Sequence, residues 1–337
     1  MKILVYVGYQ NTNITPQRIE SCDGVGGTEI AALKLAEGLA KRGHAVCFGG
    51  QVESTFHNGV TWLNIDQCHQ QHFDLLIAAS YLHYLKEFNN FDKSLFWFHN
   101  TDWFPWWRGE AVIDSSWLED PRINGFIALT EWHKQQLIRD YSLQKPIHVI
   151  GNGIDRNDFP SWKVEKIPNS FIYSSARERG LYDLLKMWPR IHQNLIGATL
   201  RVFGPGYDID NSPLPQLDGV TYMGTVDQMT LHNWQMKSEY WLHPTHYEET
   251  YGITALEAQY CGAIPITTNL AALSEVVGNR GFLLESGETD TDILNIIKVL
   301  HGSPEVKAKL RRRAHEWAKQ QTWNFRVEQW LHIINTI

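Results

Sequence analysis

Two glutamates lie on either side of a glycine in the segment HYEETYGITALEAQYCGAIPI. The apolar spacing after Gly252 predicts a helix, with Glu249 just before it and Glu257 near its second turn. The helix dipole explains an acid at the first of these positions, because it stabilises one there by ~0.3–1 kcal/mol. Glu257 instead lies within the apolar pattern, where a carboxylate without partners carries a desolvation cost. Ligand hydroxyl groups are natural partners for such an acid.

Two arginines are placed to bind phosphate. Arg177 and Arg179 follow a predicted strand at residues 170–175 and precede a predicted helix at residues 181–193. Guanidinium groups suit bidentate phosphate binding, and a doubly wound sheet opens its ligand crevice at the carboxyl ends of its strands. Two solvated arginines are the simpler alternative, and the placement favours the phosphate site. A glycine-rich turn at residues 23–29 could hold an anion in the same way, but it lacks the full G-x-G-x-x-G spacing.

These residues must be positioned by two series of alternating strands and helices. Such alternation predicts parallel sheets covered by helices on both faces. A stretch rich in proline and charge, residues 156–170, predicts a linker between the two series. The predicted fold class is therefore α/β, with two doubly wound, Rossmann-like domains and a ligand cleft between them. The predicted strands are 2–7, 45–50, 74–80, 94–99, 125–130 and 147–152 in the first series, and 170–175, 199–204, 240–245, 264–268 and 281–285 in the second.

The composition is that of an ordinary globular chain of 337 residues, long enough for two cores. The net charge of −7 argues against nucleic acid as a partner. Four cysteines without a C-x-x-C pair indicate neither a disulfide framework nor a zinc knuckle, which fits a reducing compartment. Because no segment approaches the ~18 apolar residues needed to span a bilayer, we expect a cytoplasmic protein, with peripheral membrane contact left open.

The segment with the two glutamates resembles the E-x7-E signature of retaining glycosyltransferases of family 4, which have the GT-B fold. Five other segments resemble that family in the same order along nearly the whole chain: GGTEIAALKLAEGLAKRGHAV, FWFHN, VIGNGIDRNDF, SSARERGLYDLLKMWPRI and TWNFRVEQWLHII. The resemblance implies an acceptor-side domain over residues 1–160 and a donor-binding domain over residues 161–320. It also implies a last helix, within residues 321–337, that crosses back to the first domain.

Carried over residue by residue, the resemblance assigns Glu249 to hydroxyls of the donor sugar and Glu257 to the ribose hydroxyls of the nucleotide. Arg177 would neutralise the diphosphate, and Arg179 is the second basic candidate, although the family normally has a lysine before the glycine at a longer spacing. His99 would contact the sugar or the reacting centre. Further donor contacts, largely through the backbone, would come from Gly26, Gly27, Thr225, Val226, Gly252, Ile253 and Thr254.

The implied reaction moves a sugar from a UDP-, GDP- or ADP-sugar to an acceptor hydroxyl, with retention at the anomeric carbon and without a metal or cofactor. Arginines and the helix end would stabilise the charge on the departing diphosphate. The acceptor would be a glycan, a lipid-linked molecule or a small molecule. Trp103, Trp106 and Trp107 follow His99, where they could stack on that acceptor or pack in the core.

Three alternatives stay open at this point. Asp208 and Asp210 form a D-x-D pair like that of metal-dependent glycosyltransferases of the other major fold, but the order of motifs disfavours that fold. Cys68, His69 and His72 could suggest a metal site, although their irregular polar context predicts exposed side chains. A GT-B epimerase or phosphorylase, or a relative that binds nucleotide or glycan without turnover, would share the fold. The retained donor set favours the transferase.

Overall fold

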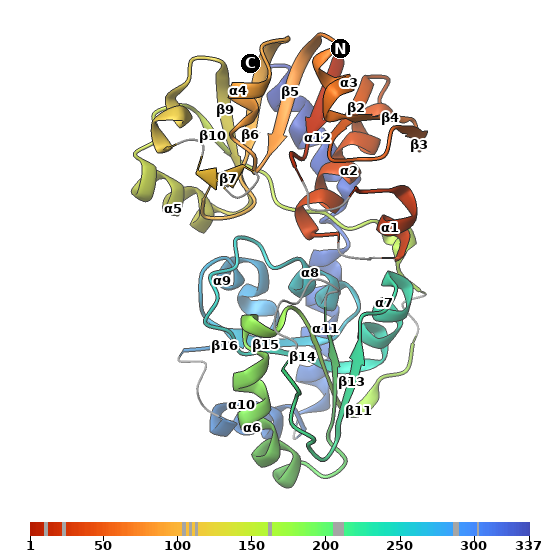
Figure 1. Cartoon of the computed structure of the whole chain (residues 1–337). Helices are drawn as coiled ribbons and strands as arrows, with labels where there is room; N and C mark the ends of the chain where they lie inside the picture. Colours follow the sequence, from red (N-terminus) through yellow and green to blue (C-terminus); the bar gives the residue numbers. More distant parts are fainter. Residues whose placement is uncertain are drawn as a thin grey trace. The chain divides into compact units, whose positions relative to one another are not determined.

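The computed structural model of the chain describes residues 1–9, 13–21, 25–102, 106–107, 110–111, 114–160, 164–204, 212–285, 290–301 and 303–337. The chain divides into two compact units (Figure 1). The first comprises Met1–Ile19, Val25–Gly153 and Trp323–Ile337, and the second comprises Glu20–Gly24 and Ile154–Thr322. Each unit has its own largely parallel sheet, which confirms the predicted α/β fold class.

The sheet of the first unit has eight strands in the order β10-β9-β6-β5-β1-β2-β4-β3. Its neighbouring strands are parallel except β3 and β4, which pair antiparallel at one edge. The central strands are buried almost throughout, as is typical of a parallel sheet covered on both faces. The strands are β1 (Lys2–Tyr6), β2 (Ala45–Gly50), β3 (Thr55–His57), β4 (Val60–Asn64), β5 (Phe73–Ala79), β6 (Phe91–Trp97), β9 (Ile123–Ala128) and β10 (Ile147–Val149).

One helix of the first unit comes from the end of the chain. α12 (Trp323–Ile334) packs on α2 (Gly27–Ala40), as predicted for the last helix (Figure 1). Gly38 permits this contact, because a Cβ there would collide with Cγ2 of Val327. Arg42 adds a hydrogen bond from its Nε to Oε1 of Glu328 at 2.7 Å. The unit also contains α3 (Ile65–His69), α4 (Tyr84–Glu87), α5 (Glu131–Tyr141), a 3-10 turn at Ser115–Glu119 and the part of α1 (Pro16–Ser21) up to Ile19.

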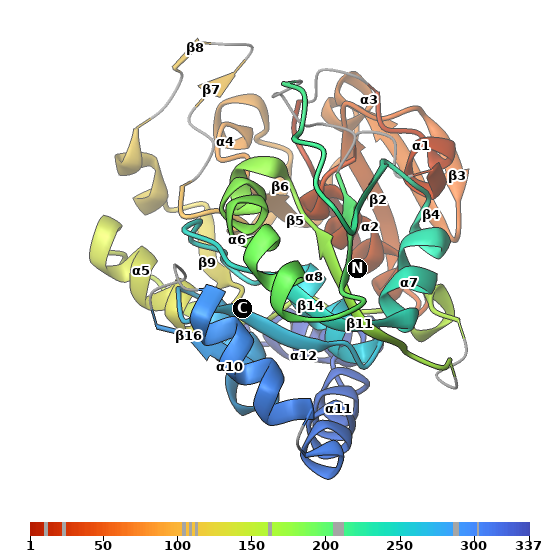
Figure 2. The ribbon, with the colours of Figure 1, turned by 90° about the horizontal axis from the view of Figure 1, so that it is seen from below.

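The second unit has a six-stranded parallel sheet in the order β13-β12-β11-β14-β15-β16. Its edge strand β13 was not predicted, because its residues are only half buried and lack a clear apolar run. Helices α10 and α11 lie side by side (Figure 2). The strands are β11 (Ile167–Ser174), β12 (Thr199–Phe203), β13 (Val220–Gly224), β14 (Ser238–His243), β15 (Ile264–Thr268) and β16 (Phe282–Leu284). The helices are α6 (Leu181–Asn194), α7 (Gln228–Lys237), α8 (Ile253–Tyr260), α9 (Leu273–Val277), α10 (Asp290–His301) and α11 (Pro304–Ala318), with 3-10 turns at Arg156–Asp158, Arg177–Arg179 and Gly278–Arg280.

The candidate metal group in the first unit does not converge on one point. Cys68 is fully buried, so the prediction of an exposed side chain is wrong for it, and burial raises the pKa of its thiol to about 12. The ring of His69 stacks on Phe88 at 4.6 Å between centroids. His72 faces the solvent-exposed Asp92, with 2.9 Å between Nε2 and Oδ1. Each of these side chains therefore has its own structural partner.

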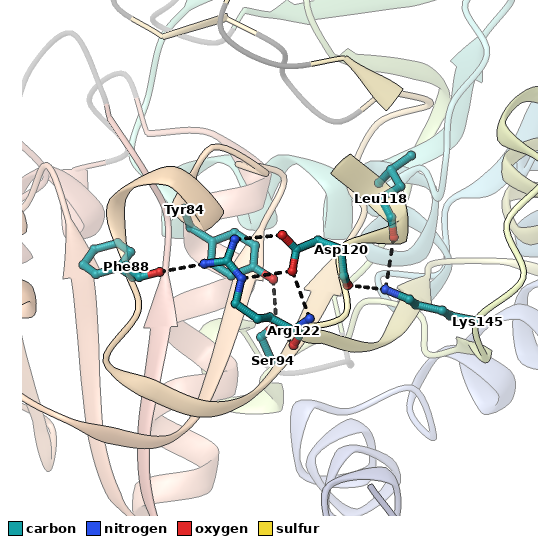
Figure 3. Close-up of polar contacts among 7 residues, drawn as sticks. All are labelled: Tyr84, Phe88, Ser94, Leu118, Asp120, Arg122 and Lys145. Atoms are coloured by element: carbon teal, nitrogen blue, oxygen red, sulfur yellow. Dashed lines mark hydrogen bonds and ion pairs between the residues drawn. The ribbon is translucent and has the colours of Figure 1, made fainter. Parts of the chain in front are cut away.

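A polar network fixes the start of β9 in the first unit (Figure 3). Arg122 donates from Nε and Nη2 to the two carboxylate oxygens of Asp120 at 2.9 and 2.8 Å, and from Nη1 to the carbonyl oxygen of Phe88. Lys145 donates to the carbonyl oxygen of Asp120. The hydrogen bond from Arg122 holds the pKa of the Asp120 carboxyl below its ordinary value. Because ligands of open α/β sheets bind at the carboxyl ends of strands, we interpret this network at the amino end as structural.

A buried acid anchors α11 to the second sheet. Glu239, in β14, accepts hydrogen bonds from Nζ of Lys307 at 2.7 Å, Nη2 of Arg311 at 2.8 Å and the backbone N–H of Asn169 at 2.8 Å. Burial alone would raise the pKa of Glu239, but the hydrogen bond and charge of Lys307 outweigh it, so that pKa lies below its ordinary value.

Within the described ranges, no helix combines the length and apolar character that crossing a bilayer requires.

We expect Glu239→Gln to lower the free energy of unfolding by about 2 kcal/mol, because it leaves two cations without their counter-charge at a partly buried site. Since the pKa of Glu239 is lowered by folding, this stabilisation is complete above the ordinary glutamate pKa and is lost as the pH falls through the lowered value. Urea unfolding at neutral and acidic pH measures both effects. The exposed neighbour variant Glu165→Gln should match the wild type. Equal stability of the two variants at neutral pH would contradict this account.

Candidate functional site

An ion pair lies beyond the carboxyl ends of two central strands of the second sheet. Arg179 follows β11 and Glu249 follows β14, and these strands are neighbours in the sheet. Arg179 Nη1 donates to Glu249 Oε1 at 3.0 Å and to Oε2 at 3.1 Å. The guanidinium also lies over the ring of Tyr247, with 4.4 Å from Cζ to the ring centroid. The sequence placed both charged residues near this edge, but it did not reveal that they bind each other.

The carboxylate of this pair is largely removed from solvent. Glu249 is 9% exposed, and burial raises its pKa, while the charge and hydrogen bonds of Arg179 oppose that rise. His243, at the end of β14, is also buried, and burial together with the charge of Arg179 lowers its pKa to about 3. The imidazole of His243 is therefore neutral at physiological pH. Arg179 supplies the positive charge that favours the ionised form of Glu249.

Two glycines allow the loops that carry this pair to pack closely. Gly180 follows Arg179 with φ +109°, and a Cβ there would collide with the carbonyl oxygen of Pro244. Gly252 has φ +82°, and a Cβ there would lie 2.8 Å from Cδ2 of Leu273. A left-handed backbone and such close neighbours both exclude a side chain at these positions. The loop after β11 can therefore reach the loop after β14.

The start of α8 offers a site for an anion. The first N–H groups of an α-helix have no partner within the helix, and the helix dipole places positive charge there. Gly252 is the N-cap of α8, and Ile253 and Thr254 begin the helix with half-buried side chains. These three residues are among those to which the resemblance assigned backbone contacts with the donor. Their placement is compatible with anion binding by backbone N–H groups.

Glu257 lies one turn into α8 and faces α7. It is 7% exposed, and its Oε2 accepts a hydrogen bond from Nε2 of Gln235 at 3.4 Å. Its Oε1 lies 3.8 Å from Nε2 of His232, which is within ion-pair distance. The burial expected from the apolar pattern is therefore correct, and the protein itself supplies partners for the carboxylate. Sequence reasoning missed His232, because nothing in the spacing of His232 and Glu257 indicates a contact.

The other candidates of the second unit lie on separate segments. Arg177 Nη1 donates to the carbonyl oxygen of Ser212 at 2.8 Å, whereas Arg179 in the same 3-10 turn reaches Glu249. Thr225 is exposed and Val226 half-buried, in the turn between β13 and α7. This turn lies at the carboxyl end of its strand, as expected for a residue pair that meets a ligand.

The first unit carries the remaining described candidates. Gly26 is the N-cap of α2, and Gly27 is the first residue of that helix. His99 lies just beyond β6, is 7% exposed and packs on Trp97 with 4.3 Å between ring centroids. Burial, together with the nearby His133, lowers the pKa of His99 to about 3. His99 is therefore neutral at physiological pH and suited to hydrogen bonding but not to charge neutralisation.

Two predictions from the sequence fall on positions whose side chains the structure does not describe. A short hairpin pairs β7 (Trp106–Trp107) with β8 (Glu110–Ala111), and it contains two of the three candidate tryptophans (Figure 2). Trp103 lies outside the described residues. The D-x-D pair of Asp208 and Asp210 also lies outside them.

Comparison with known proteins finds a family match within the second unit. Residues 170–301, which carry Arg177, Arg179, Glu249 and Glu257, match the family described as "Glycosyl transferases group 1". This match lies entirely within the second unit. The chain is also 27% identical over 193 residues to glycogen synthase of Mycobacterium tuberculosis, and 28% identical over 165 residues to phosphatidyl-myo-inositol mannosyltransferase of Propionibacterium freudenreichii. These matches cover 53% and 46% of this chain and 45% and 41% of the two relatives, so the chain aligns with less than half of each.

Solved structures extend the likeness over the whole chain. Sucrose-phosphate synthase from Thermosynechococcus elongatus is similar with a TM-score of 0.75 and 16% identity, covering 100% of this chain and 98% of that one. The Anabaena protein HepE, solved in complex with UDP-glucose, is similar with a TM-score of 0.72 and 14% identity, covering 100% of both chains. At these identities the likeness concerns the fold. The predicted GT-B fold and the resemblance to glycosyltransferases are thereby confirmed.

The ion pair of Arg179 and Glu249 leads to a prediction about ionisation. We expect Arg179→Met to raise the pKa of Glu249 further, because the substitution removes the charge that opposes the effect of burial. NMR titration of the Glu249 side-chain carboxyl carbon measures that pKa. Arg177→Met is the matched control and should leave it unchanged, since Arg177 binds the Ser212 carbonyl instead. An unchanged pKa in Arg179→Met would show that the ion pair does not form in solution.

Proposed function

We propose that this protein is a retaining, metal-independent glycosyltransferase of family 4, which moves a sugar from a nucleotide-diphosphate sugar to an acceptor hydroxyl. The observation that carries the proposal is the ion pair of the buried Glu249 and the half-buried Arg179 beside the start of α8. The loops after β11 and β14 thus bring a guanidinium, a carboxylate and the N–H groups of a helix start together at the carboxyl ends of two neighbouring strands. A carboxylate suits sugar hydroxyls, and a guanidinium and helix N–H groups suit diphosphate oxygens. The same cationic and N–H groups stabilise negative charge that develops on the diphosphate.

In this proposal the second unit, within residues 161–320, binds the donor. Glu249 accepts hydrogen bonds from hydroxyls of the donor sugar, and Glu257 accepts them from the ribose. The N–H groups at the start of α8 bind the diphosphate, together with Arg177. Thr225 and Val226 lie against the base. Structural neighbours solved in complex with UDP and with UDP-glucose support a nucleotide-sugar donor.

Arg179 has two roles in the proposed reaction. It favours the ionised form of Glu249, and its guanidinium charge neutralises the diphosphate as that group leaves. The bond between the anomeric carbon and the diphosphate oxygen breaks while the acceptor oxygen bonds to the same face of that carbon. The proton of the acceptor hydroxyl passes to the departing phosphate oxygen. The protein therefore acts by preorganised charge, and no side chain needs to gain or lose a proton.

The first unit, within residues 1–160, takes the acceptor side in this proposal. Gly26 and Gly27 approach the donor with backbone alone, at the start of α2. His99 contributes a neutral imidazole that hydrogen-bonds the sugar at the reacting centre. Trp103, Trp106 and Trp107 are the proposed acceptor contacts, because indole rings stack well on the apolar faces of sugar rings.

A donor panel tests the reaction class. The protein is screened by thermal shift against UDP-, GDP- and ADP-sugars, and the product formed from the stabilising donor is examined by NMR with and without EDTA. We expect a product with the anomeric configuration of the donor and the same rate in EDTA. An inverted product, or loss of activity on chelation, would reject the mechanism. Donor consumption that needs no acceptor would indicate an epimerase or hydrolase instead.

Substitution of Glu249 and substitution of Glu257 should impair different steps of the reaction. We expect Glu249→Ala to lower kcat by about 100-fold or more while free nucleotide still binds, because this acid meets the sugar. Glu257→Ala should instead weaken nucleotide binding by about tenfold, because this acid meets the ribose. Calorimetry with the free nucleoside diphosphate and initial rates separate the two results. Glu248→Ala, which removes the exposed neighbour, is the control. Normal transfer by both variants would show that the assigned roles are wrong.

A further inference from the structure

His232 is a buried residue that connects the nucleotide-side acid Glu257 to the segment entering the second unit. It lies on α7 and is 2% exposed, and its ring faces both Glu257 and the segment that enters the second unit. Its Nδ1 lies 2.7 Å from the carbonyl oxygen of Asp158, and its Nε2 lies 3.8 Å from Oε1 of Glu257. Its ring stacks on Phe159 with 3.9 Å between centroids and 17° between planes. Polar groups therefore lie beside both ring nitrogens, and an aromatic ring packs on one face of the imidazole.

The partners of the ring determine where its protons lie. A carbonyl oxygen only accepts hydrogen bonds, so Nδ1 carries a proton and donates it to Asp158. Nε2 therefore bears a hydrogen only in the charged imidazolium. The charged ring attracts the carboxylate of Glu257, whereas the neutral ring would turn a lone pair toward it. The attraction between His232 and Glu257 consequently depends on the protonation state of His232.

The segment on the other side of the ring is where the chain enters the second unit. Ile154 begins this unit after Gly153, and it forms a parallel bridge with Thr322, where the chain leaves the unit. Asp155 caps the 3-10 turn Arg156–Asp158 with its side chain. Phe159 then packs on both His232 and Tyr260, the last residue of α8. This entry segment, residues 154–159, is therefore packed against His232 of α7 and Tyr260 of α8.

We propose that His232 is a positioning residue that fixes the carboxylate of Glu257 for the ribose and joins nucleotide binding to the entry segment. The inference rests on the proposed function, because it requires that Glu257 binds ribose hydroxyls. Binding of the ribose holds Glu257 against the imidazolium, and the imidazolium holds Asp158 and Phe159. Removal of the ring frees the carboxylate on one side and the entry segment on the other.

The protonation of His232 gives the inference a pH dependence. Burial lowers the pKa of His232, but the hydrogen bond and charge of Glu257 outweigh burial, so this pKa lies above its ordinary value. Asp158 also faces the ring and acts in the same direction. Cys261 packs nearby, and burial raises its thiol pKa, so it stays neutral. Lys166 binds the carbonyl oxygen of Cys261. Burial lowers the pKa of Lys166 to about 7, so this lysine also titrates near neutral pH.

The test compares the wild type with His232→Gln and His232→Phe. Calorimetry uses whichever of UDP, GDP or ADP stabilises the wild type most, together with its 2′,3′-dideoxy counterpart. We expect both variants to bind the normal nucleotide about tenfold more weakly, but the dideoxy compound within about twofold of the wild type, because that compound offers Glu257 no hydroxyl. An equal loss for both compounds would show that His232 only supports the fold. His192→Gln, which also removes a histidine bound to a backbone carbonyl, is the matched control.

Two further measurements report on the charge of His232 and on the stability of the entry segment. Wild-type affinity should fall several-fold as the pH rises through the His232 pKa, and His232→Gln should lack this step. A step that persists in the variant would come from another group, such as Lys166 or the terminal phosphate of the nucleotide, and would overturn the inference. Nucleotide should slow amide hydrogen exchange at residues 155–159 in the wild type and not in His232→Phe. If the wild type binds none of the three nucleotides, the proposed function itself fails; if it binds one and the variants bind equally well, only this inference fails.

Discussion

Burial of a carboxylate beside a cation is the constraint on which the second unit depends. A carboxylate removed from water is stable in its charged form only if nearby groups replace the lost hydration. Glu249 meets this requirement through Arg179, which reaches it from a different strand of the sheet. The position of the guanidinium in turn requires Gly180 to adopt a backbone conformation and a proximity that a larger residue would not tolerate. The charge of one glutamate thus constrains the path of two loops.

The parallel sheet supplies the geometry that makes such a pair accessible to a ligand. In a parallel sheet the carboxyl ends of all strands lie at one edge, so residues far apart in sequence meet there. Residues 179 and 249 meet because β11 and β14 are neighbours in the sheet, although α6, β12, β13 and α7 lie between these strands along the chain. The opposite edge of the first sheet carries the pair of Asp120 and Arg122, which closes a turn. Similar ion pairs therefore differ in role according to the edge at which they lie.

The sequence predicted the parts of this structure that depend on local pattern. Apolar runs located most strands, and the spacing around Gly252 located α8 with its two acids. The partners of those acids could not be predicted in the same way, because contacts such as His232 with Glu257 depend on how α7 and α8 pack. The half-buried β13 was missed for a related reason, since an edge strand lacks the continuous apolar pattern of a central one. Motif spacing indicates chemistry within a segment, whereas the tertiary fold determines its electrostatic surroundings.

The two glutamates flanking Gly252 illustrate how one helix start can carry two different kinds of charge. Glu249 is paired with an arginine, whose charge does not change over the physiological range of pH. Glu257 faces a histidine, whose charge does change in that range. An acid that must remain ionised throughout a reaction is best served by the permanent cation. In the proposed function, Glu257 holds a ribose that must later leave, and a weaker cation of variable charge can serve that task. The pairing of Glu249 with Arg179 and of Glu257 with His232 is consistent with this division.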